Sequence, residues 1–340
     1  MLGRRVTLRD VADRAGVHPS TASRAINEHT RSLVDDKTVE RVLQAANDLG
    51  YQPDSLARAL KTNRTHTVGM LLPDLTNPLF PPIVRGIEDG LGGAHYTVIL
   101  GNTDNDPAKE RTVISALLGR RIDGLILATT EREPSPIIAK LMDGGLPTVL
   151  VNRTIDDPRV PSVLGDDRVG IELAVDHLVD LGHTRIAHVA GPQRTSTGLL
   201  RHDSFVASMQ RAGLPVNRDR IVFADWFREA PGATACRTLL DRCPDTTAIV
   251  AANDLIAIGC YDVANERDLQ IGVDMSVVGY NDMLFADKLC PPLTTIRIPH
   301  YQLGLRAAQL ILNLINDAHA EPEQVRLTPT LVRRASTGPV

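Results

Sequence analysis

The feature that most constrains the fold is an alternation of strand-like and helix-like segments that begins near His66 and continues to the end of the chain. Short apolar runs typical of buried strands occur at 67–72, 96–101, 123–128, 147–151, 161–165, 185–190, 219–223, 247–251 and 275–280. Amphipathic helical patterns lie between most of them, for example at 83–91, 108–120, 171–181, 199–212 and 254–266. This alternation predicts parallel α/β sheets with helices on both faces, and the length predicts two such lobes.

Small-molecule sites in parallel sheets lie beyond the carboxyl ends of the strands. A cleft between two lobes is a favoured place for a ligand. We therefore expect any ligand of the α/β region to bind between its lobes.

The opening residues follow a different, wholly helical pattern. Thr7 and Asp10 have the spacing of a capping box at the start of a first helix. Gly16 suits the end of that helix and the turn, and Pro19 suits the first position of a second helix. A third helix is expected over 36–49. Two helices joined by a short turn that contains glycine predict a helix-turn-helix.

The two sides of the second predicted helix differ in character. Its apolar side carries Ala22, Ala25 and Ile26. Its polar side carries Ser20, Arg24 and Asn27. Short or forked donors of this kind can reach base edges, whereas a merely solvated face would favour Lys and Glu. The alternative is a plain three-helix bundle without a ligand.

Charge is distributed unevenly along the chain. The whole chain has a net charge of −4, from 37 basic and 41 acidic residues. Residues 1–64 hold 11 of the basic and 8 of the acidic residues, a net charge of +3, which leaves −7 for the remainder. A mildly basic head on an acidic body can approach phosphate with one end only.

Several classes of protein are disfavoured by missing signals. No apolar run approaches the ~18 residues of a membrane span, and no apolar stretch follows Arg4 and Arg5 as in a signal peptide. We therefore expect a cytoplasmic protein. Four cysteines without a CxxC pair predict buried, reduced thiols: Cys236, Cys243, Cys260 and Cys290.

An enzyme and an exported sugar-binding protein are the two alternatives to a DNA-binding regulator. The segment GLGGAH (90–95) fails the GxGxxG pattern, and the chain contains no GxxxxGK[ST], HExxH or GxSxG. We therefore predict no catalytic residue, no cofactor and no metal. A transport-type binding protein would share the α/β body but would need a leader for export.

Segments along the whole chain resemble the LacI/GalR family of bacterial regulators. They are VTLRDVADRAGVHPSTASRAIN (6–27), LGYQPDSLARALK (49–61), VGMLLPDLTNPLF (68–80), VDHLVDLGHTRIAHVAGP (175–192), AANDLIAIG (251–259), VVGYND (277–282), PPLTTIRIP (291–299) and LVRRASTGP (331–339). The resemblance implies a sequence-specific DNA-binding transcriptional regulator, a repressor whose operator affinity is controlled by a small-molecule effector. A sugar is the expected effector, and a nucleoside or purine corepressor is the alternative.

The resemblance also implies the domain organisation. An all-α helix-turn-helix headpiece over 1–52 is followed by a hinge helix over 53–63. An α/β domain of two lobes, like those of periplasmic binding proteins, then binds the effector and pairs two subunits over 64–340. Its lobes are expected at 64–162 with 293–322, and at 163–291 with 323–340, crossed by strands near 162–164, 291–293 and 322–326.

For the headpiece, the resemblance implies that the second helix enters the major groove. Ser20 and Arg24 match positions that read bases, and Arg24 could fork onto guanine O6 and N7. In the hinge, Leu60 would wedge between base pairs from the minor groove, unless it packs with Leu56 against the headpiece. The implied DNA-binding residues are Thr7, His18, Ser20, Thr21, Ser23, Arg24, Asn27, Ala57, Leu60 and Lys61.

For the α/β domain, the resemblance implies an effector site whose Arg, Asn and Asp side chains engage paired hydroxyls. Trp226, the only Trp, would cover the apolar side of a sugar ring, unless it is ordinary core packing. The implied effector-binding residues are Leu79, Phe80, Asn152, Arg153, Thr195, Thr197, Arg201, Trp226, Asn253, Asp254, Asn281 and Asp282.

Three residues depart from the family pattern. His18 stands where Ser or Thr usually caps the second helix. Pro19 stands where a contacting side chain is common, so specificity rests more on Ser20 and Arg24. Asn281 is neutral where Asp is common, which disfavours cationic ligands. A heptad repeat is not sustained beyond Leu314, so we expect a homodimer on a near-palindromic operator, without a tetramerising tail or a membrane partner.

Overall fold

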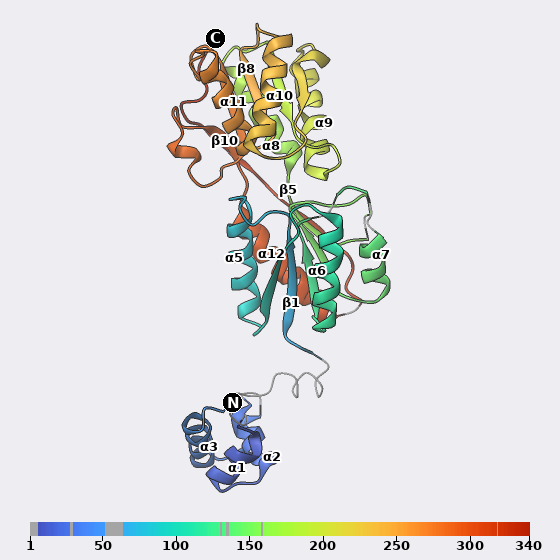
Figure 1. Ribbon diagram of the computed structural model, residues 1–340, viewed down its shortest axis with the longest axis vertical. Helices are drawn as coiled ribbons and strands as arrows, with labels where there is room; N and C mark the ends of the chain where they lie inside the picture. Colours follow the sequence, from blue (N-terminus) through green and yellow to red (C-terminus); the bar gives the residue numbers. More distant parts are fainter. Residues whose placement is uncertain are drawn as a thin grey trace. The chain divides into compact units, whose positions relative to one another are not determined.

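A computed structural model describes residues 6–27, 30–51, 64–129, 131–133, 136–157, 159–317 and 319–340. The chain divides into two compact units, Met1–Thr65 and His66–Val340, drawn from blue to red along the sequence in Figure 1. Among the helices within these described ranges, none has the length and apolar character needed to cross a membrane.

The first unit consists of the expected helices, α1 (Leu8–Ala15), α2 (Pro19–Ile26) and α3 (Asp36–Asp48), with a short 3-10 turn η1 (Arg31–Leu33). The predicted capping box is present, because Asp10 N donates to Thr7 Oγ1 at 3.3 Å and Thr7 N donates to Asp10 Oδ2 at 2.8 Å. Gly16 has φ of 64°, the left-handed conformation that ends α1 and turns the chain. The helices enclose a small apolar core that includes Val11, Ala12, Ala22, Ala25 and Val42.

The first sheet of the second unit is parallel throughout, in the order β11-β5-β4-β3-β1-β2. Its strands are β1 (Thr67–Leu72), β2 (Thr97–Asn102), β3 (Gly124–Leu127), β4 (Thr148–Val151), β5 (Ser162–Gly165) and β11 (Gln324–Leu327). Side chains alternate across it, so Met70 packs in the core beneath α5 (Phe80–Gly92) and α12 (His300–Asn316). Leu71 packs in the core beneath α6 (Pro107–Gly119) and α7 (Pro136–Asp143).

The second sheet has the order β12-β10-β9-β8-β6-β7, with only β12 antiparallel to its neighbour. Its strands are β6 (Ile186–Ala190), β7 (Ile221–Phe223), β8 (Ala248–Ala251), β9 (Ser276–Asn281), β10 (Thr294–Arg297) and β12 (Thr330–Val332). One face is covered by α8 (Asp167–Asp180) and α9 (Ser196–Arg211), and the other by α10 (Glu229–Arg242) and α11 (Asp254–Glu266). Two 3-10 turns, η2 (Arg218–Arg220) and η3 (Ala286–Lys288), complete the lobe.

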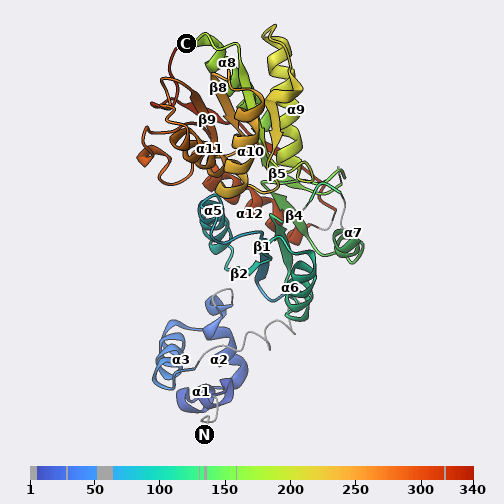
Figure 2. The same ribbon diagram turned by 45° about the horizontal axis from the view of Figure 1, so that its top comes forward.

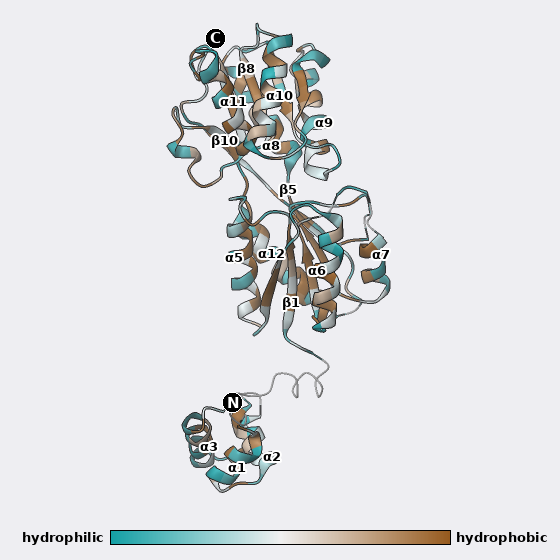
Figure 3. Cartoon of the chain, viewed as in Figure 1, coloured by the Kyte–Doolittle hydropathy of each residue, from teal (hydrophilic) through white to brown (hydrophobic). Residues whose placement is uncertain are grey.

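Figures 2 and 3 show the layers of each lobe and the distribution of hydrophobic residues in them. In each lobe helices cover both faces of a sheet, and the strands, coloured brown in Figure 3, are more hydrophobic than the outward sides of the helices. Strands buried on both faces need continuous apolar runs. The nine predicted runs correspond to β1 through β9 with each end within two residues, whereas the strand expected near 291–293 lies at 294–297. The expected two-lobed α/β architecture is confirmed.

The chain passes between the sheets three times, after β5, β10 and β11. These positions lie beyond the expected lobe boundaries: residues 163–165 and 324–327 belong to the first sheet, and 294–297 belong to the second. The physical reason is that each strand completes its hydrogen-bonded ladder before the chain crosses.

The cysteines differ from the expectation at one position. Cys236, Cys243 and Cys260 are buried free thiols, whereas Cys290 is exposed. Cys290 lies in the loop between β9 and β10, outside the layers that bury the other three.

Candidate functional site

The exposed face of α2 is polar and is presented by a buried apolar face. Ala22 and Ala25 are completely buried against α1 and α3, which fixes the rotation of the helix. Its exposed side chains are Ser20, Ser23, Arg24 and Asn27, and Thr21 is half-buried at their edge. The helix therefore displays hydrogen-bond donors and one guanidinium to the exterior.

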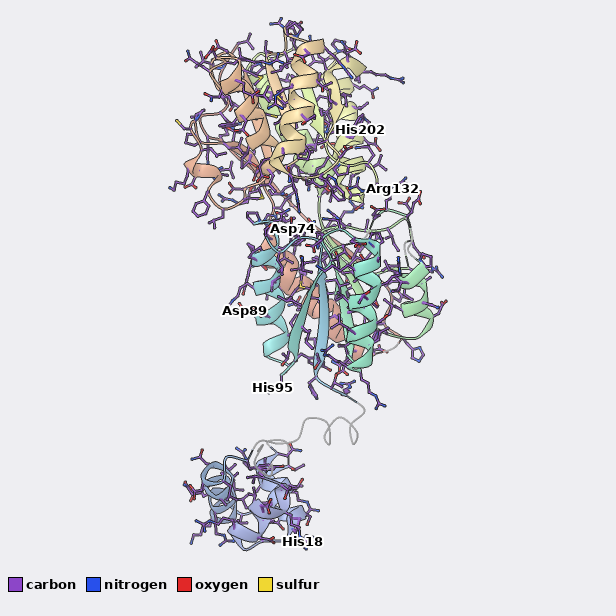
Figure 4. All side chains as sticks on the ribbon, in the orientation of Figure 1. His18, Asp74, Asp89, His95, Arg132 and His202 are labelled. Atoms are coloured by element: carbon purple, nitrogen blue, oxygen red, sulfur yellow. The ribbon has the colours of Figure 1, made fainter. Side chains whose placement is uncertain are left out.

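Both ends of α2 are secured by side chains. The ring Nδ1 of His18, which is labelled in Figure 4, accepts a hydrogen bond from Ser20 N at 3.2 Å and lies 2.8 Å from Ser20 Oγ. His18 thus performs the capping role usual for Ser or Thr. At the other end, Arg31 Nε donates to Ala25 O at 3.0 Å. Arg31 was not predicted from the sequence, because it contacts a backbone carbonyl, which leaves no residue pattern.

The expected hinge contacts Ala57, Leu60 and Lys61 lie outside the described residues.

The second unit contains a cavity of about 420 Å³ between its two sheets. It is lined by loops that follow β1, β2, β3 and β4 of the first sheet, and β6 and β7 of the second. The lining residues are Pro73, Asp74, Asn77, Asn105, Pro107, Glu110, Arg111, Thr129, Glu131, Glu133, Pro136, Ile137, Arg153, Pro192, Arg194, Thr195, Trp226, Phe227 and Arg228. This is the position expected of a ligand site in parallel sheets.

Ion pairs join the two lobes at the rim of the cavity. Arg228 Nη2 lies 2.7 Å from Asp74 Oδ2, and Arg194 Nε lies 2.9 Å from Glu131 Oε1. The Arg194 guanidinium also lies 4.1 Å from the centre of the Trp226 ring. Figure 4 shows Asp74 at the junction of the lobes. One face of Trp226 is therefore covered by a cation.

Arg153 lies inside the cavity and is buried, with 8% of its surface exposed. Its Nε has no hydrogen-bond partner. Burial, followed by the positive charges of Arg194 and Arg201, lowers the pKa of Arg153 to about 10. Nearby, burial raises the pKa of Glu110. The positive charge of Arg153 in the cavity is thus only weakly compensated by the surrounding residues.

Other charged groups near the cavity are already satisfied. Arg201 Nε bonds Asp167 Oδ1 at 2.8 Å, and its Nη1 donates to Ala252 O at 2.7 Å. Asp254 accepts hydrogen bonds from Thr295 Oγ1 at 2.5 Å and Met283 N at 2.7 Å. Burial raises the pKa of Asp254 to about 7.

Three expected effector residues, Arg153, Thr195 and Trp226, line the cavity together. The others are absent from its lining: Leu79, Phe80, Asn152, Thr197, Arg201, Asn253, Asp254, Asn281 and Asp282. Leu79 and Phe80 pack in the apolar core, and Asp282 pairs with Arg297 and Arg334 at 2.7 Å each.

The remaining expected residues lie close to strand ends or helix starts. Asn253 caps α11 by accepting from Ile256 N at 2.9 Å, and Thr197 donates to Thr195 Oγ1 at 3.4 Å. Asn152 has φ of 65° at the end of β4, and Asn281 is buried at the end of β9 with its Oδ1 unpartnered. Their contact with an effector stays a prediction.

Most of the charged lining was not predicted from the sequence, namely Asp74, Glu110, Arg111, Glu131, Glu133, Arg194 and Arg228. Most of these residues follow the carboxyl end of a strand, which is the signal that could have identified them. Within the described part of the chain, no group of three or more His, Cys, Asp or Glu is placed to hold a metal ion.

Comparisons with known proteins agree with this architecture. The family model for bacterial regulatory proteins of the lacI family matches residues 7–54. The model for periplasmic binding proteins and the sugar binding domain of the LacI family matches residues 65–335. These ranges correspond to the two units of the fold.

Relatives span nearly the whole chain. The ribose operon repressor of Escherichia coli strain K12 is 35% identical over 331 residues, covering 97% of this chain and 99% of that repressor. The HTH-type transcriptional repressor PurR of Photobacterium profundum is 32% identical over 332 residues, covering 97% and 98%. Among solved structures, the Lac repressor dimer bound to operator and the anti-inducer ONPF is similar with a TM-score of 0.87 and 28% identity, covering 98% of this chain and all of that one.

Three observations point to the same family. They are a helix-turn-helix with an exposed polar face, a two-lobed α/β unit with a cavity at its strand ends, and relatives that match nearly the whole chain. The chain belongs to the LacI family of bacterial transcriptional regulators.

Proposed function

We propose that this protein is a transcriptional repressor that binds a near-palindromic DNA operator as a homodimer, in the cytoplasm and without enzymatic activity. The observation that carries this proposal is the exposed polar face of α2 on a helix whose other face is buried. In a helix-turn-helix such a helix reads the major groove, and a two-fold dimer presents two of them to two half-sites.

The cavity between the sheets supports an effector site for a small, hydroxyl-rich molecule, for which a sugar is the first candidate. Its volume of about 420 Å³ falls within the usual range for small-molecule pockets. Its lining combines Thr195 with charged donors and acceptors, and Trp226 offers an aromatic surface at the rim. A nucleoside or purine is the second candidate, because the PurR relative is similar over the whole chain.

The effector would act by changing the relative orientation of the lobes and so the pairing of the hinges that hold the two headpieces. Such allostery is a coupling free energy between two sites, so an effector that changes operator affinity must have its own affinity changed equally by the operator. Ala57, Leu60 and Lys61 are the proposed hinge contacts, and Leu60→Ala should weaken operator binding while leaving effector affinity nearly unchanged.

The decisive experiment selects genomic DNA fragments on the purified full-length protein and then measures operator affinity with and without effector. The effector is first sought by thermal unfolding with monosaccharides, disaccharides and nucleosides, because a ligand that binds the folded state raises the melting temperature. We expect a bound effector to change operator affinity by between about 5- and 150-fold.

Two results would contradict the proposal. One is the absence of any selected fragment at low ionic strength, where phosphate contacts are strongest, under every metabolite condition tested. The other is an operator affinity that no bound metabolite changes. The first would defeat the DNA-binding assignment, and the second would defeat only the allosteric one.

A further inference from the structure

Arg153 lies in the lining of the cavity without an ion-pair partner among the described residues. Arg153 follows β4, lines the cavity and is more than nine-tenths buried. Its Nε has no hydrogen-bond partner, and no carboxylate of the described chain forms an ion pair with its guanidinium. A buried charge is normally paired, because an unpaired one forfeits its hydration without compensation.

The neighbouring charges do not supply the missing partner. Glu131 is paired with Arg194 at 2.9 Å, and Asp167 is paired with Arg201 at 2.8 Å. Burial raises the pKa of Glu110. Glu131 and Glu110 act on the Arg153 guanidinium electrostatically, but neither forms an ion pair with it. The two nearby guanidiniums, of Arg194 and Arg201, add positive charge around Arg153.

Neutral hydroxyl groups could accept hydrogen bonds from a guanidinium, but they would leave its charge uncompensated. A carboxylate or phosphate would accept two parallel hydrogen bonds from its fork and cancel the charge. Asn152 beside Arg153 and Asn281 at the end of β9 contribute no negative charge of their own. The lining of the cavity holds four basic and four acidic residues in all, and within it the Arg153 guanidinium is the group that is complementary to an anion.

We propose that the effector of this protein is an anionic sugar derivative whose oxyanion, a carboxylate or a phosphate, binds the Arg153 guanidinium. This inference rests on the cavity being the effector site proposed above. It narrows the effector from polyols in general to sugar acids and sugar phosphates.

The test compares matched neutral and anionic sugars on the full-length protein by calorimetry and thermal unfolding. The pairs are D-glucose with D-gluconate and D-glucuronate, and D-ribose with ribose 5-phosphate, so that carboxylate and phosphate are distinguished. Sodium acetate and sodium phosphate at matched ionic strength probe the oxyanion site without a sugar. We expect an anionic member to bind at least about tenfold more tightly than its neutral parent.

Variants of Arg153 assign the effect to this residue. Arg153→Met should weaken anion binding about 100-fold and should raise the melting temperature of the ligand-free protein, because it removes an unpaired buried charge. Arg153→Lys, which keeps the charge but loses the fork, should retain a weaker preference for anions. Arg237→Met is the matched control, since Arg237 pairs with Glu266 on the surface at 2.7 Å.

The possible outcomes separate this inference from the function on which it rests. Stabilisation of the wild type by acetate or phosphate, lost in Arg153→Met, supports it even if no tested sugar binds. Equal or tighter binding of a neutral parent overturns it, as does equal stabilisation of wild type and Arg153→Met by every anion. Loss of ligand-free stability in Arg153→Met also overturns it. A separate measurement of operator binding tests the proposed DNA-binding function independently of the effector.

Discussion

His188 on β6 is held as a neutral imidazole in the core of the second lobe. Its Nδ1 lies 2.7 Å from Val250 O, and because a carbonyl can only accept, Nδ1 carries the proton. The ring stacks on Phe205 with centroids 4.8 Å apart, and its Nε2 is buried without a partner. Protonation of Nε2 would bury a charge, and burial lowers the pKa of His188 to about 4.

This residue predicts acid sensitivity of the effector-binding unit. Between pH 6.5 and 4 the unfolded chain binds a proton at His188 that the folded protein does not, so stability falls as the pH falls. Going from pH 7.5 to 5 should cost about 2 kcal/mol through this group alone. Urea unfolding of the wild type and His188→Gln at both pH values should show the smaller loss in the variant.

Other groups titrate in the same interval and define the control. Burial also lowers the pKa values of His177 and His183, which act in the same direction as His188. The pKa of His300 is also lowered to about 4 by burial, and it acts in the same direction. Asp254, with its pKa raised to about 7, acts in the opposite direction, because the folded state holds the proton more tightly than the unfolded chain. The comparison of wild type and variant cancels all these contributions, and identical pH dependence in the two proteins would refute the assignment to His188.

Arg24 on the exposed face of α2 is the residue on which base recognition is predicted to depend. Arg24→Ala should weaken operator binding by about 1–3 kcal/mol and relax specificity at one base pair in each half-site. Titration of the selected operator and of single-base variants measures both effects. Arg41→Ala on α3 removes the same charge from another exposed position. Equal losses of affinity in the two variants, without a change in specificity, would argue against direct readout.

At the scale of elements, helices α5 and α12 pack unusually closely through two glycines. A Cβ added at Gly86 would lie 2.1 Å from Tyr301 O, and one added at Gly304 would lie 2.1 Å from Ile83 O. Backbone atoms on both sides leave no flexible group to move. The first lobe therefore depends on glycine at both positions.

Gly304→Val should destabilise the effector-binding unit by about 3 kcal/mol or more, because the helices must separate. Gly92→Ala is a matched control in α5, since a Cβ there meets nothing within 4 Å. That control should be neutral or stabilising by up to about 1 kcal/mol. Thermal unfolding compares the two, and a stable Gly304→Val would show that α12 can shift without loss.

Elements of the fold differ in how well the sequence predicts them. The capping box at Thr7 and the apolar runs of β1 and β8 are local patterns, and the structure confirms them. The short strand β12 has no such run: it has only three residues, none of them fully buried, and it pairs with β10 on one side only. Lobe boundaries depend on which of the two sheets each strand joins. That is a long-range property, and local sequence patterns do not contain it.

The candidate site shows the same division between local and long-range information. Trp226, Thr195 and Arg153 were predicted from resemblance and line the cavity. The pair of Asp74 with Arg228 was not predicted, because it joins residues 154 positions apart whose neighbours in sequence give no sign of the contact.

At the scale of the whole effector-binding unit, contacts across the cavity hold its lobes together. Besides the pairs at Asp74 and Glu131, Thr154 N donates to Ser196 Oγ at 2.9 Å and Arg132 N donates to Arg194 O at 2.8 Å. Figure 4 shows Arg132 near the same junction as Asp74. The arrangement of the two lobes is thus stabilised at several points around the rim.

Asp74→Asn should favour a more open arrangement and lower effector affinity by up to about fivefold, since Arg228 is more than half exposed and its pair is worth at most about 1 kcal/mol. Calorimetry gives the affinity, and Trp226 fluorescence reports the rim. Asp241→Asn, which disrupts the surface pair with Arg267, is the control. An unchanged effector affinity in Asp74→Asn would show that the pair of Asp74 with Arg228 does not contribute to effector binding.

The three passages of the chain between the sheets have a consequence for synthesis. The headpiece is continuous and has its whole core by Tyr51, whereas the sheet of the first lobe lacks its outer strand until Leu327 has been made. A nascent or prematurely ended polypeptide would therefore contain a complete helix-turn-helix core before either sheet of the second unit is complete. Control of DNA binding by an effector therefore requires synthesis of nearly the whole chain.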